Sequence, residues 1–200
     1  GAQKGLMLPP GMSFNAISDK AIAASKTSKM LKSFLAWDDM LNMNKLGYFP
    51  YTPATPMLPG MAVAIDMLHE EGLDNVFARH DRLAEATRRA VKHWGLDIIC
   101  ADPKAYSPTL TAVLTPDGVD ADGFRALALE HFNIAYGASF GRFAGKMFRI
   151  GHLGDINDGD LLGGLAITEM ALSLANVPHK NGGVQAAMDY LTAAHRGAAR

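Results

Sequence analysis

The sequence predicts a mixed α/β chain made of two bodies, the second of which is a compact α+β unit. The first 55 residues are punctuated by prolines and glycines, residues 58–94 repeat apolar side chains at helical spacing, and beyond Gly95 strand-like and helix-like runs alternate. Apolar residues make up 48% of the 200 residues and charged residues 20%, a balance that supports a packed core. We expect one body over residues 1–72 and the other over residues 73–200.

The first body is expected to be rich in loops. Residues 13–17 predict a short strand, and residues 19–32 predict a helix with Ser18 or Asp19 as its N-cap. Apolar residues then recur every three or four positions over residues 58–72, which predicts a second helix that ends at its glycine.

A long amphipathic helix is predicted over residues 73–94. Its apolar positions should face inward: Val76, Leu83, Ala90 and Val91. Its charged positions should form a solvated face: Arg79, Arg82, Glu85, Arg88, Arg89 and Lys92.

The remaining chain predicts a small sheet with helices packed on one face. Strands are expected at residues 96–100, 110–115, 133–136 and 146–150. Helices are expected from Asp120 or Asp122 to about His131, from Asp158 to about Ala175, and from Val184 to His195. The closed core of residues 96–177 should contain Phe124, Leu127, Ile150 and Leu165, and His131 should be either a core histidine or a helix-end histidine.

Composition excludes several function classes. The net charge is −1 with no basic stripe and no acidic tail, which argues against a nucleic-acid partner. The most apolar stretch, residues 161–177, contains Glu169 and two glycines and predicts a buried helix, not a membrane span. The single cysteine, Cys100, allows no disulfide framework, so we expect a cytoplasmic protein. The chain opens at Gly1 without a leader pattern, and we expect it to begin inside a longer protein.

Three familiar site patterns fail or stay weak. The seven histidines show no helical pairing, so no metal site is predicted. Residues 141–146 are one residue short of a phosphate loop, and Met147 stands where a hydroxyl is required. Gly137–Gly141 matches a nucleophile elbow centred on Ser139, but no helix is predicted directly after it. A serine hydrolase therefore remains a remote alternative, as does a non-catalytic interaction fragment, beside a plain glycine loop.

Two isolated cations have both a functional and an ordinary interpretation. Lys4 lies among glycines and leucines, where desolvation would free its amine to attack a carbonyl, although most lysines are simply exposed. Arg149 is flanked by apolar residues on a predicted strand. Its planar fork suits a substrate carboxylate, and the alternative is an internal salt bridge.

Four segments resemble the class V pyridoxal-phosphate aminotransferases of the glyoxylate branch, and bacterial serine–glyoxylate aminotransferases in particular. Residues 1–11, GAQKGLMLPPG, are similar to the family's lysine segment, and residues 148–155, FRIGHLGD, to its carboxylate-binding arginine segment. Residues 49–56, FPYTPATP, resemble the segment that reaches the cofactor phosphate of the neighbouring subunit, and residues 70–80 are also similar to the family. The resemblance covers essentially the whole chain in matching order.

The resemblance implies an aspartate-aminotransferase fold, with residues 1–72 as the end of the large cofactor domain and residues 73–200 as the small α+β domain. It implies pyridoxal 5'-phosphate as cofactor and Lys4 as the Schiff-base lysine, which also moves the proton. Gln3 and Thr52 would help to hold the phosphate, with Tyr51 as a weaker candidate, and Arg149 would bind the substrate α-carboxylate.

The implied reaction is transamination between L-serine and glyoxylate, giving hydroxypyruvate and glycine in a homodimer with interfacial active sites. Alanine, or plain or hydroxylated aspartate, is the alternative amino donor. An aspartate that pairs with the pyridine nitrogen is expected upstream, so the 200 residues alone should be inactive. Two positions depart from the family, since Ala2 replaces a usual serine and Pro59 a common tyrosine. Proline is tolerated in the first turn of a helix.

Overall fold

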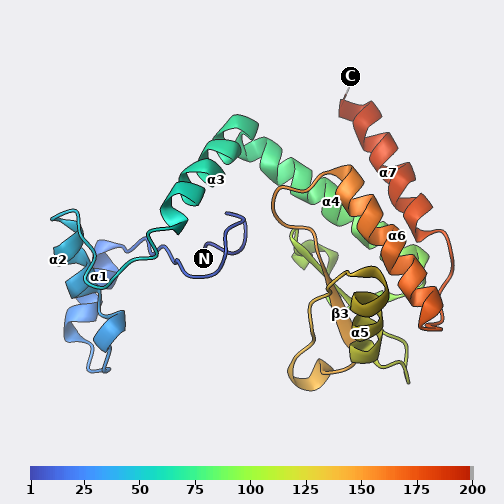
Figure 1. Cartoon of the computed structure of the whole chain (residues 1–200), viewed down its shortest axis with the longest axis horizontal. Coiled ribbons are helices and arrows are strands. Elements are labelled where there is room, and N and C mark those ends of the chain that lie inside the picture. The colour runs from blue at the N-terminus through green and yellow to red at the C-terminus, as the bar shows by residue number, and fades with distance from the viewer. Residues whose placement is uncertain (199–200) are drawn as a thin grey trace. The chain divides into compact units, whose positions relative to one another are not determined.

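The computed structural model of the protein describes residues 1–198 and divides the chain into two compact units (Figure 1). The first unit runs from Gly1 to Met67, and the second begins at Leu68. The division falls inside helix α3 (Met57–Glu71), a few residues before the predicted boundary at residue 72. The helix that begins in the first unit therefore ends in the second.

The first unit consists of short helices joined by long loops. In chain order they are α1 (Asp19–Thr27), a 3-10 turn (Ser33–Leu35), α2 (Trp37–Asn44) and most of α3. Ser18 caps α1 by accepting the backbone N–H of Ala21 at 3.3 Å, which confirms one of the two predicted caps. The helix ends at Thr27 and not at residue 32, because Ser28 already has an extended backbone.

In the first unit one predicted strand is absent, and one helix is present that the sequence does not predict. Residues 13–17 form no strand, since no described segment pairs with them, and an unpaired strand leaves its backbone groups unsatisfied. Helix α2 was not predicted, because the prolines and glycines around it indicate loops. Asp38 and Asp39 in its first turn favour this helix by complementing the positive end of its dipole.

The second unit is a three-stranded antiparallel sheet packed with four helices. Its elements are α4 (Leu73–His93), β1 (Asp97–Ile98), β2 (Leu110–Leu114), α5 (Ala121–Phe132), β3 (Met147–Gly151), α6 (Asp158–Leu174) and α7 (Gly183–Ala198), with 3-10 turns at Pro103–Ala105 and Gly141–Phe143. The strand order is β1-β2-β3, with Ile98 opposite Val113 and Val113 opposite Phe148. Three of the four predicted strands are confirmed, although β1 keeps only two of its five predicted residues and β3 is shifted by one residue.

The fourth predicted strand, residues 133–136, is wrong. Asn133 adopts a left-handed backbone with φ of 53°, which ends α5 and turns the chain. The chain therefore reaches β3 only at Gly137, where one bridge forms to Arg149.

The helix starts in the second unit are set by side-chain caps. Asp120 caps α5 by accepting the N–H of Asp122 at 2.9 Å, as one of the two predictions has it. Asn157, and not the predicted Asp158, caps α6, because Asn157 and Asp160 form a reciprocal capping box.

The start of α7 is held by a buried tryptophan and a carboxylate. Glu169 accepts the Trp94 indole N–H at 2.8 Å and the backbone N–H groups of Gly182 and Val184 at 2.6 and 3.2 Å. The Trp94 ring lies so close to Gly183 that a Cβ on this glycine would stand 2.6 Å from ring atom Cε2. The first turn of α7 is thereby fastened to the end of α4.

The hydrophobic core lies in the second unit. Phe124, Ile150 and Leu165 are buried as predicted, and Leu127 is partly buried against them. His131 is exposed in the last turn of α5, so the inward orientation is wrong and the helix-end interpretation holds. No helix within residues 1–198 is both long and apolar enough to cross a membrane.

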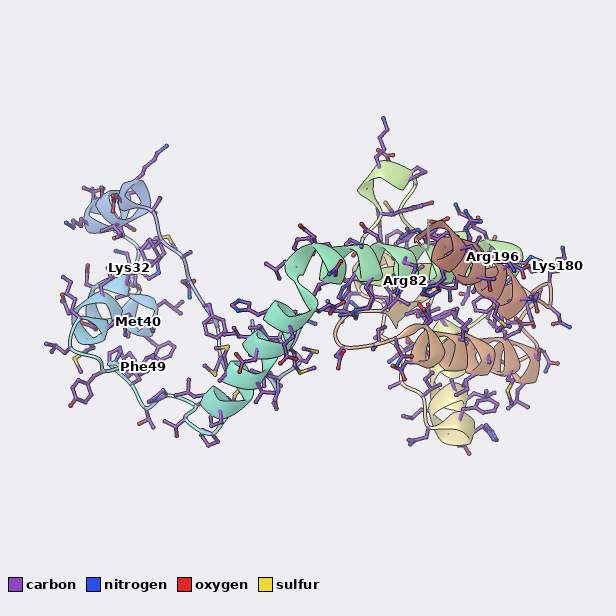
Figure 2. All side chains as sticks on the ribbon, turned by 90° about the horizontal axis from the view of Figure 1, so that it is seen from above. Lys32, Met40, Phe49, Arg82, Lys180 and Arg196 are labelled. Atoms are coloured by element: carbon purple, nitrogen blue, oxygen red, sulfur yellow. The ribbon has the colours of Figure 1, made fainter. Side chains whose placement is uncertain are left out.

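The long helix α4 buries its four predicted apolar positions, but its charged face is only partly solvated. Arg79 and Arg88 keep 14% and 13% of their side chains exposed, and Arg82 forms an ion pair with Asp158 of α6. Arg89 and Lys92 alone among the predicted cations are exposed. Arg82 lies among the crowded side chains of the second unit, whereas Lys32, Met40 and Phe49 lie in the first unit (Figure 2).

Candidate functional site

The lysine segment is a closed loop. The Ala2 N–H donates to the Met12 carbonyl at 3.0 Å, and the Leu8 N–H donates to the Ala2 carbonyl at 3.1 Å. Within this loop the Met7 N–H donates to the Lys4 carbonyl at 2.8 Å, which places Lys4 on a turn. The Lys4 side chain is exposed, so the apolar, desolvated setting that the sequence predicts is not present within residues 1–198.

Helix α3 supports this loop. A Cβ on Gly60 would stand 2.9 Å from the Leu8 side chain, and a Cβ on Gly11 would stand 3.1 Å from the Met57 sulfur. Pro59, one of the two departures from the family, lies in the first turn of α3 and leaves the helix intact. The other departure, Ala2, is fully buried and offers only a methyl group.

The predicted phosphate ligands are accessible. Gln3 and Thr52 are exposed, and the Tyr51 ring packs against Phe34 with centroids 4.7 Å apart. Within residues 1–198, no hydrogen bond or ion pair joins Tyr51 or Thr52 to Lys4. An amine can condense with the aldehyde of pyridoxal phosphate, and amide and hydroxyl groups can donate hydrogen bonds to its phosphate. The residues present therefore fit this cofactor chemically.

Arg149 lies in the second unit, in the middle of β3. The Arg149 backbone lies opposite Ala112 of β2 on one side and opposite Gly137 on the other. It exchanges two 3.0 Å hydrogen bonds with the backbone of Gly137. The side chain is half-buried, and its Nε is a buried donor without a hydrogen-bond partner in the described chain. No carboxylate among residues 1–198 forms an ion pair with it, so the alternative of an internal salt bridge is not found. The guanidinium is therefore available to an anionic group.

The loop that follows Arg149 is anchored by His152. This imidazole is fully buried; its Nδ1 donates to the Pro108 carbonyl at 3.0 Å, and its Nε2 accepts the Thr111 hydroxyl at 2.9 Å. Burial lowers the pKa of His152 to about 4, and Arg88 and His80 act in the same direction. His152 is therefore a neutral side chain that joins the loop to Pro108 and to Thr111 of β2.

The same loop is bound to α4 by two adjacent residues. His80 accepts the Gly154 N–H at 3.1 Å, and Arg79 donates to the carbonyls of Gly154 and Ile156 at 2.7 and 3.0 Å. Arg79 also binds Glu71 through two hydrogen bonds of 2.6 and 2.7 Å, which raise its pKa. Sequence reasoning placed Arg79 in solvent and gave His80 no role; their only signal was the resemblance of residues 70–80 to the family.

Ser139 does not form a nucleophile elbow. Its hydroxyl accepts the backbone N–H of Gly145 at 3.0 Å, and a 3-10 turn, not an α-helix, follows it. No histidine in the described chain is hydrogen-bonded to it, so the base that a serine hydrolase requires is missing from this arrangement.

Comparison with known proteins relates the whole arrangement to one fold. No family model matches the chain. Its backbone superposes on pyridoxamine–pyruvate aminotransferase from Mesorhizobium loti with a TM-score of 0.87 and a sequence identity of 32%. The superposition covers 96% of this chain and 50% of that chain. A small antiparallel sheet with helices, preceded by a lysine loop, is thus the carboxy-terminal architecture of fold type I pyridoxal-phosphate aminotransferases.

Sequence relatives narrow the class to a family. The chain is 45% identical over 195 residues to a serine–glyoxylate aminotransferase from Hyphomicrobium methylovorum, and 39% identical over 191 residues to an L-aspartate–glyoxylate aminotransferase from Paracoccus denitrificans. These matches cover 96% and 95% of this chain and 48% of each relative, so the chain spans about half the length of the curated relatives it matches. The chain belongs to the class V aminotransferases, as the four segments predict.

Proposed function

We propose that the protein transfers an amino group from L-serine to glyoxylate, giving hydroxypyruvate and glycine, with pyridoxal phosphate as cofactor. The observation that carries this proposal is the Arg149 guanidinium, which is half-buried without a counter-charge in a chain 45% identical to a serine–glyoxylate aminotransferase. Both amino acid and oxo acid substrates carry the carboxylate that this cation lacks.

Arg149 would bind the α-carboxylate of each substrate in turn. A guanidinium donates two parallel hydrogen bonds to a carboxylate, which fixes orientation as well as charge. The β-ladder on both sides of Arg149 holds its backbone, and the buried Nε has already lost its water. The desolvation cost of the cation is thus met in the fold before a substrate arrives.

Lys4 would attach the cofactor and move the proton. When bound, pyridoxal phosphate withdraws electron density from the substrate α-carbon. The Lys4 Nζ, exposed on its turn, would take the proton from that carbon and return it. Gln3 and Thr52 would donate hydrogen bonds to the phosphate, and Tyr51 is the weaker candidate because its ring already packs on Phe34.

Two further proposals concern assembly. We assign residues 1–72 to the large cofactor domain and residues 73–200 to the small domain, and we expect a homodimer in which Thr52 serves the partner's cofactor. Exposed apolar side chains in the first unit support an interface there: Met30, Leu31, Phe34, Leu35, Leu46, Tyr48 and Phe49. A cytoplasmic location fits the single thiol, Cys100.

A different amino donor is the second candidate. The 39% identity to an L-aspartate–glyoxylate aminotransferase favours aspartate, and alanine is the other alternative. Initial rates with glyoxylate and each of L-serine, L-aspartate and L-alanine decide among them. A higher kcat/KM with aspartate or alanine would replace serine as the donor and leave the transamination itself in place.

The direct test of the chemistry is cofactor trapping on the intact protein. Borohydride reduction after incubation with pyridoxal phosphate should add the cofactor to Lys4, which peptide mass spectrometry locates. Serine-dependent formation of glycine from glyoxylate should disappear with the same treatment. Labelling of another lysine, with activity lost in parallel, would overturn the assignment of Lys4.

Arg149 and Thr52 have separate tests. Arg149→Ala should raise KM for both serine and glyoxylate, since truncating one partner of such a pair costs about 2–5 kcal/mol. Arg149→Lys should rescue poorly, because an ammonium lacks the planar fork. If only one substrate is affected, Arg149 binds a side chain instead.

Complementation tests the dimer. Lys4→Ala and Thr52→Ala proteins, mixed under conditions of subunit exchange, should recover activity, because a hybrid dimer contains one site free of both changes. Absence of recovery after demonstrated exchange would show that Thr52 acts within its own chain.

A further inference from the structure

The segment Gly137–Gly141, which resembles a nucleophile elbow, has no role in the function proposed so far. It follows Tyr136, which is buried and fixed by a 2.8 Å hydrogen bond between its hydroxyl and that of Thr168. The segment then runs alongside β3, and its first residue, Gly137, exchanges two 3.0 Å backbone hydrogen bonds with Arg149. Gly137 is therefore the second backbone neighbour of Arg149, opposite Ala112 of β2.

Gly137 gives the Arg149 side chain the space it occupies. A Cβ on Gly137 would stand 2.8 Å from Arg149 Nε, 3.1 Å from its Cβ and 3.2 Å from its Cζ. The guanidinium therefore lies across the bare backbone of this glycine. Any side chain at Gly137 would force the arginine into another rotamer.

Phe140 covers the same guanidinium. Arg149 Cζ lies 5.2 Å from the centre of the Phe140 ring, a cation–π distance, while the ring keeps 71% of its surface exposed. Three hydrogen bonds order the turn that carries the ring: Ser139 Oγ accepts the Gly145 N–H at 3.0 Å, and the Phe143 and Ala144 N–H groups donate to the Phe140 and Gly141 carbonyls at 3.2 and 3.1 Å. The ring thus belongs to a fixed turn.

These two contacts orient a cation without consuming its hydrogen bonds. A carboxylate neighbour would hold Arg149 equally well but would neutralise it and compete with a substrate. A glycine backbone and an aromatic face restrict the side chain by shape and by the ring quadrupole, and no protein acceptor among the described residues takes up its terminal N–H donors, which stay available to a ligand.

We propose that Gly137 and Phe140 are positioning residues that hold the Arg149 guanidinium in its carboxylate-binding orientation. The inference rests on the proposed function, because it takes a substrate carboxylate as the ligand of Arg149. It assigns the elbow-like segment to substrate binding and gives Ser139 the task of closing the turn.

The kinetic test compares variants of the intact, cofactor-loaded protein. Phe140→Ala should raise KM for serine and for glyoxylate by about tenfold with a smaller change in kcat, since a cation–π contact is lost. Phe140→Tyr should restore both constants, because tyrosine presents a similar ring. Gly137→Ala should cost more, up to about a hundredfold in kcat/KM, because the arginine is displaced. Phe143→Ala is the matched control: it removes a ring from the same turn that packs on Arg142 and leaves Arg149 untouched.

A second measurement needs no turnover. The Nε–Hε NMR signal of Arg149, assigned by its loss in Arg149→Lys, should shift when glyoxylate is added to the protein without cofactor. Phe140→Ala should move this signal in the free protein, because the ring current disappears, and should weaken the glyoxylate response. Phe143→Ala should do neither.

The outcomes are separable. If the unmodified full-length protein does not transaminate, the proposed function fails, and the NMR comparison alone decides the positioning role. If it transaminates while Phe140→Ala leaves both KM values and the Arg149 signal unchanged, the positioning role is overturned. If Gly137→Ala does not fold by circular dichroism, Phe140→Ala and Phe140→Tyr still decide.

Discussion

The two units of the molecule handle their apolar side chains in opposite ways. Of the buried hydrophobic residues, the first unit contributes only Ala2 and Ala64, whereas the second contributes a continuous cluster that includes Trp94, Phe148 and Leu165. The first unit leaves large apolar groups exposed, with Leu31 fully accessible. The proposed chemistry divides in a similar way, because an exposed lysine belongs to the first unit and a half-buried arginine to the second. The difference teaches that the second unit is stabilised from within, while the exposed side chains of the first add little to its stability.

The largest effect should come from a residue with almost no structural role. Lys4→Ala should reduce turnover at least about a thousandfold, because attachment and proton transfer are both lost. The free energy of unfolding should change by less than about 0.5 kcal/mol, since the side chain is exposed. Steady-state kinetics and urea unfolding measure the two; a large loss of stability would contradict the contrast between the units.

A core truncation should do the reverse. Phe148 is fully buried in β3, so Phe148→Ala should lower the free energy of unfolding by about 3–5 kcal/mol. The matched change in the first unit is Phe14→Ala, at a ring that is 52% exposed, and it should cost less than about 0.5 kcal/mol. Equal costs at the two phenylalanines would break the comparison.

The buried histidine of the second unit should make its stability depend on pH. The pKa of His152 falls from its ordinary value of 6.5 to about 4 on folding, so the unfolded chain takes up a proton before the folded one does. Stability from this group is complete above pH 6.5 and should decline by up to roughly 3 kcal/mol as the pH falls to 4. His152→Gln should flatten the unfolding profile in this window, whereas His131→Asn, at an exposed site, should leave it unchanged.

A smaller effect is expected at the start of α7. Burial alone would raise the pKa of Glu169, but hydrogen bonds from Trp94, Gly182, Val184 and Gly183 outweigh it and hold the pKa below its ordinary value. Glu169→Gln should therefore cost about 1–3 kcal/mol at neutral pH. The cost should shrink as the pH falls through the lowered pKa, because Glu169 then loses the stabilising charge that the glutamine variant lacks at every pH. Glu130→Gln, at an exposed position of α5, is the control.

The same contrast explains what the sequence could predict. The spacing of apolar residues predicts α4 well, since Val76, Leu83, Ala90 and Val91 repeat at helical spacing and are all buried in the structure. The first unit has no such repeat, so α2 was missed and a strand was wrongly placed at residues 13–17. Local pattern fails where one residue decides, as at Asn133, whose left-handed backbone removes a predicted strand.

Candidate site residues can be proposed from the sequence, but their geometry cannot. The resemblance drew attention to Lys4 and Arg149, but no spacing rule reveals that a guanidinium lacks a counter-charge, because that is a property of every neighbour in three dimensions. Arg79 shows the opposite error: its pattern indicates a solvated helix face, and its contacts are two loop carbonyls and Glu71. Hydrogen bonds to carbonyls leave no mark in the amino-acid types that accept them.

The close approach of Trp94 to Gly183 has a consequence for anyone who redesigns this chain. Because a Cβ at Gly183 would overlap the indole, a saturation library at this position selected for a folded protein should return mainly glycine codons. The restriction is also mutual. Random variation could admit alanine at Gly183 only together with a smaller residue at Trp94, so the two codons should be selected together although they lie far apart in the gene.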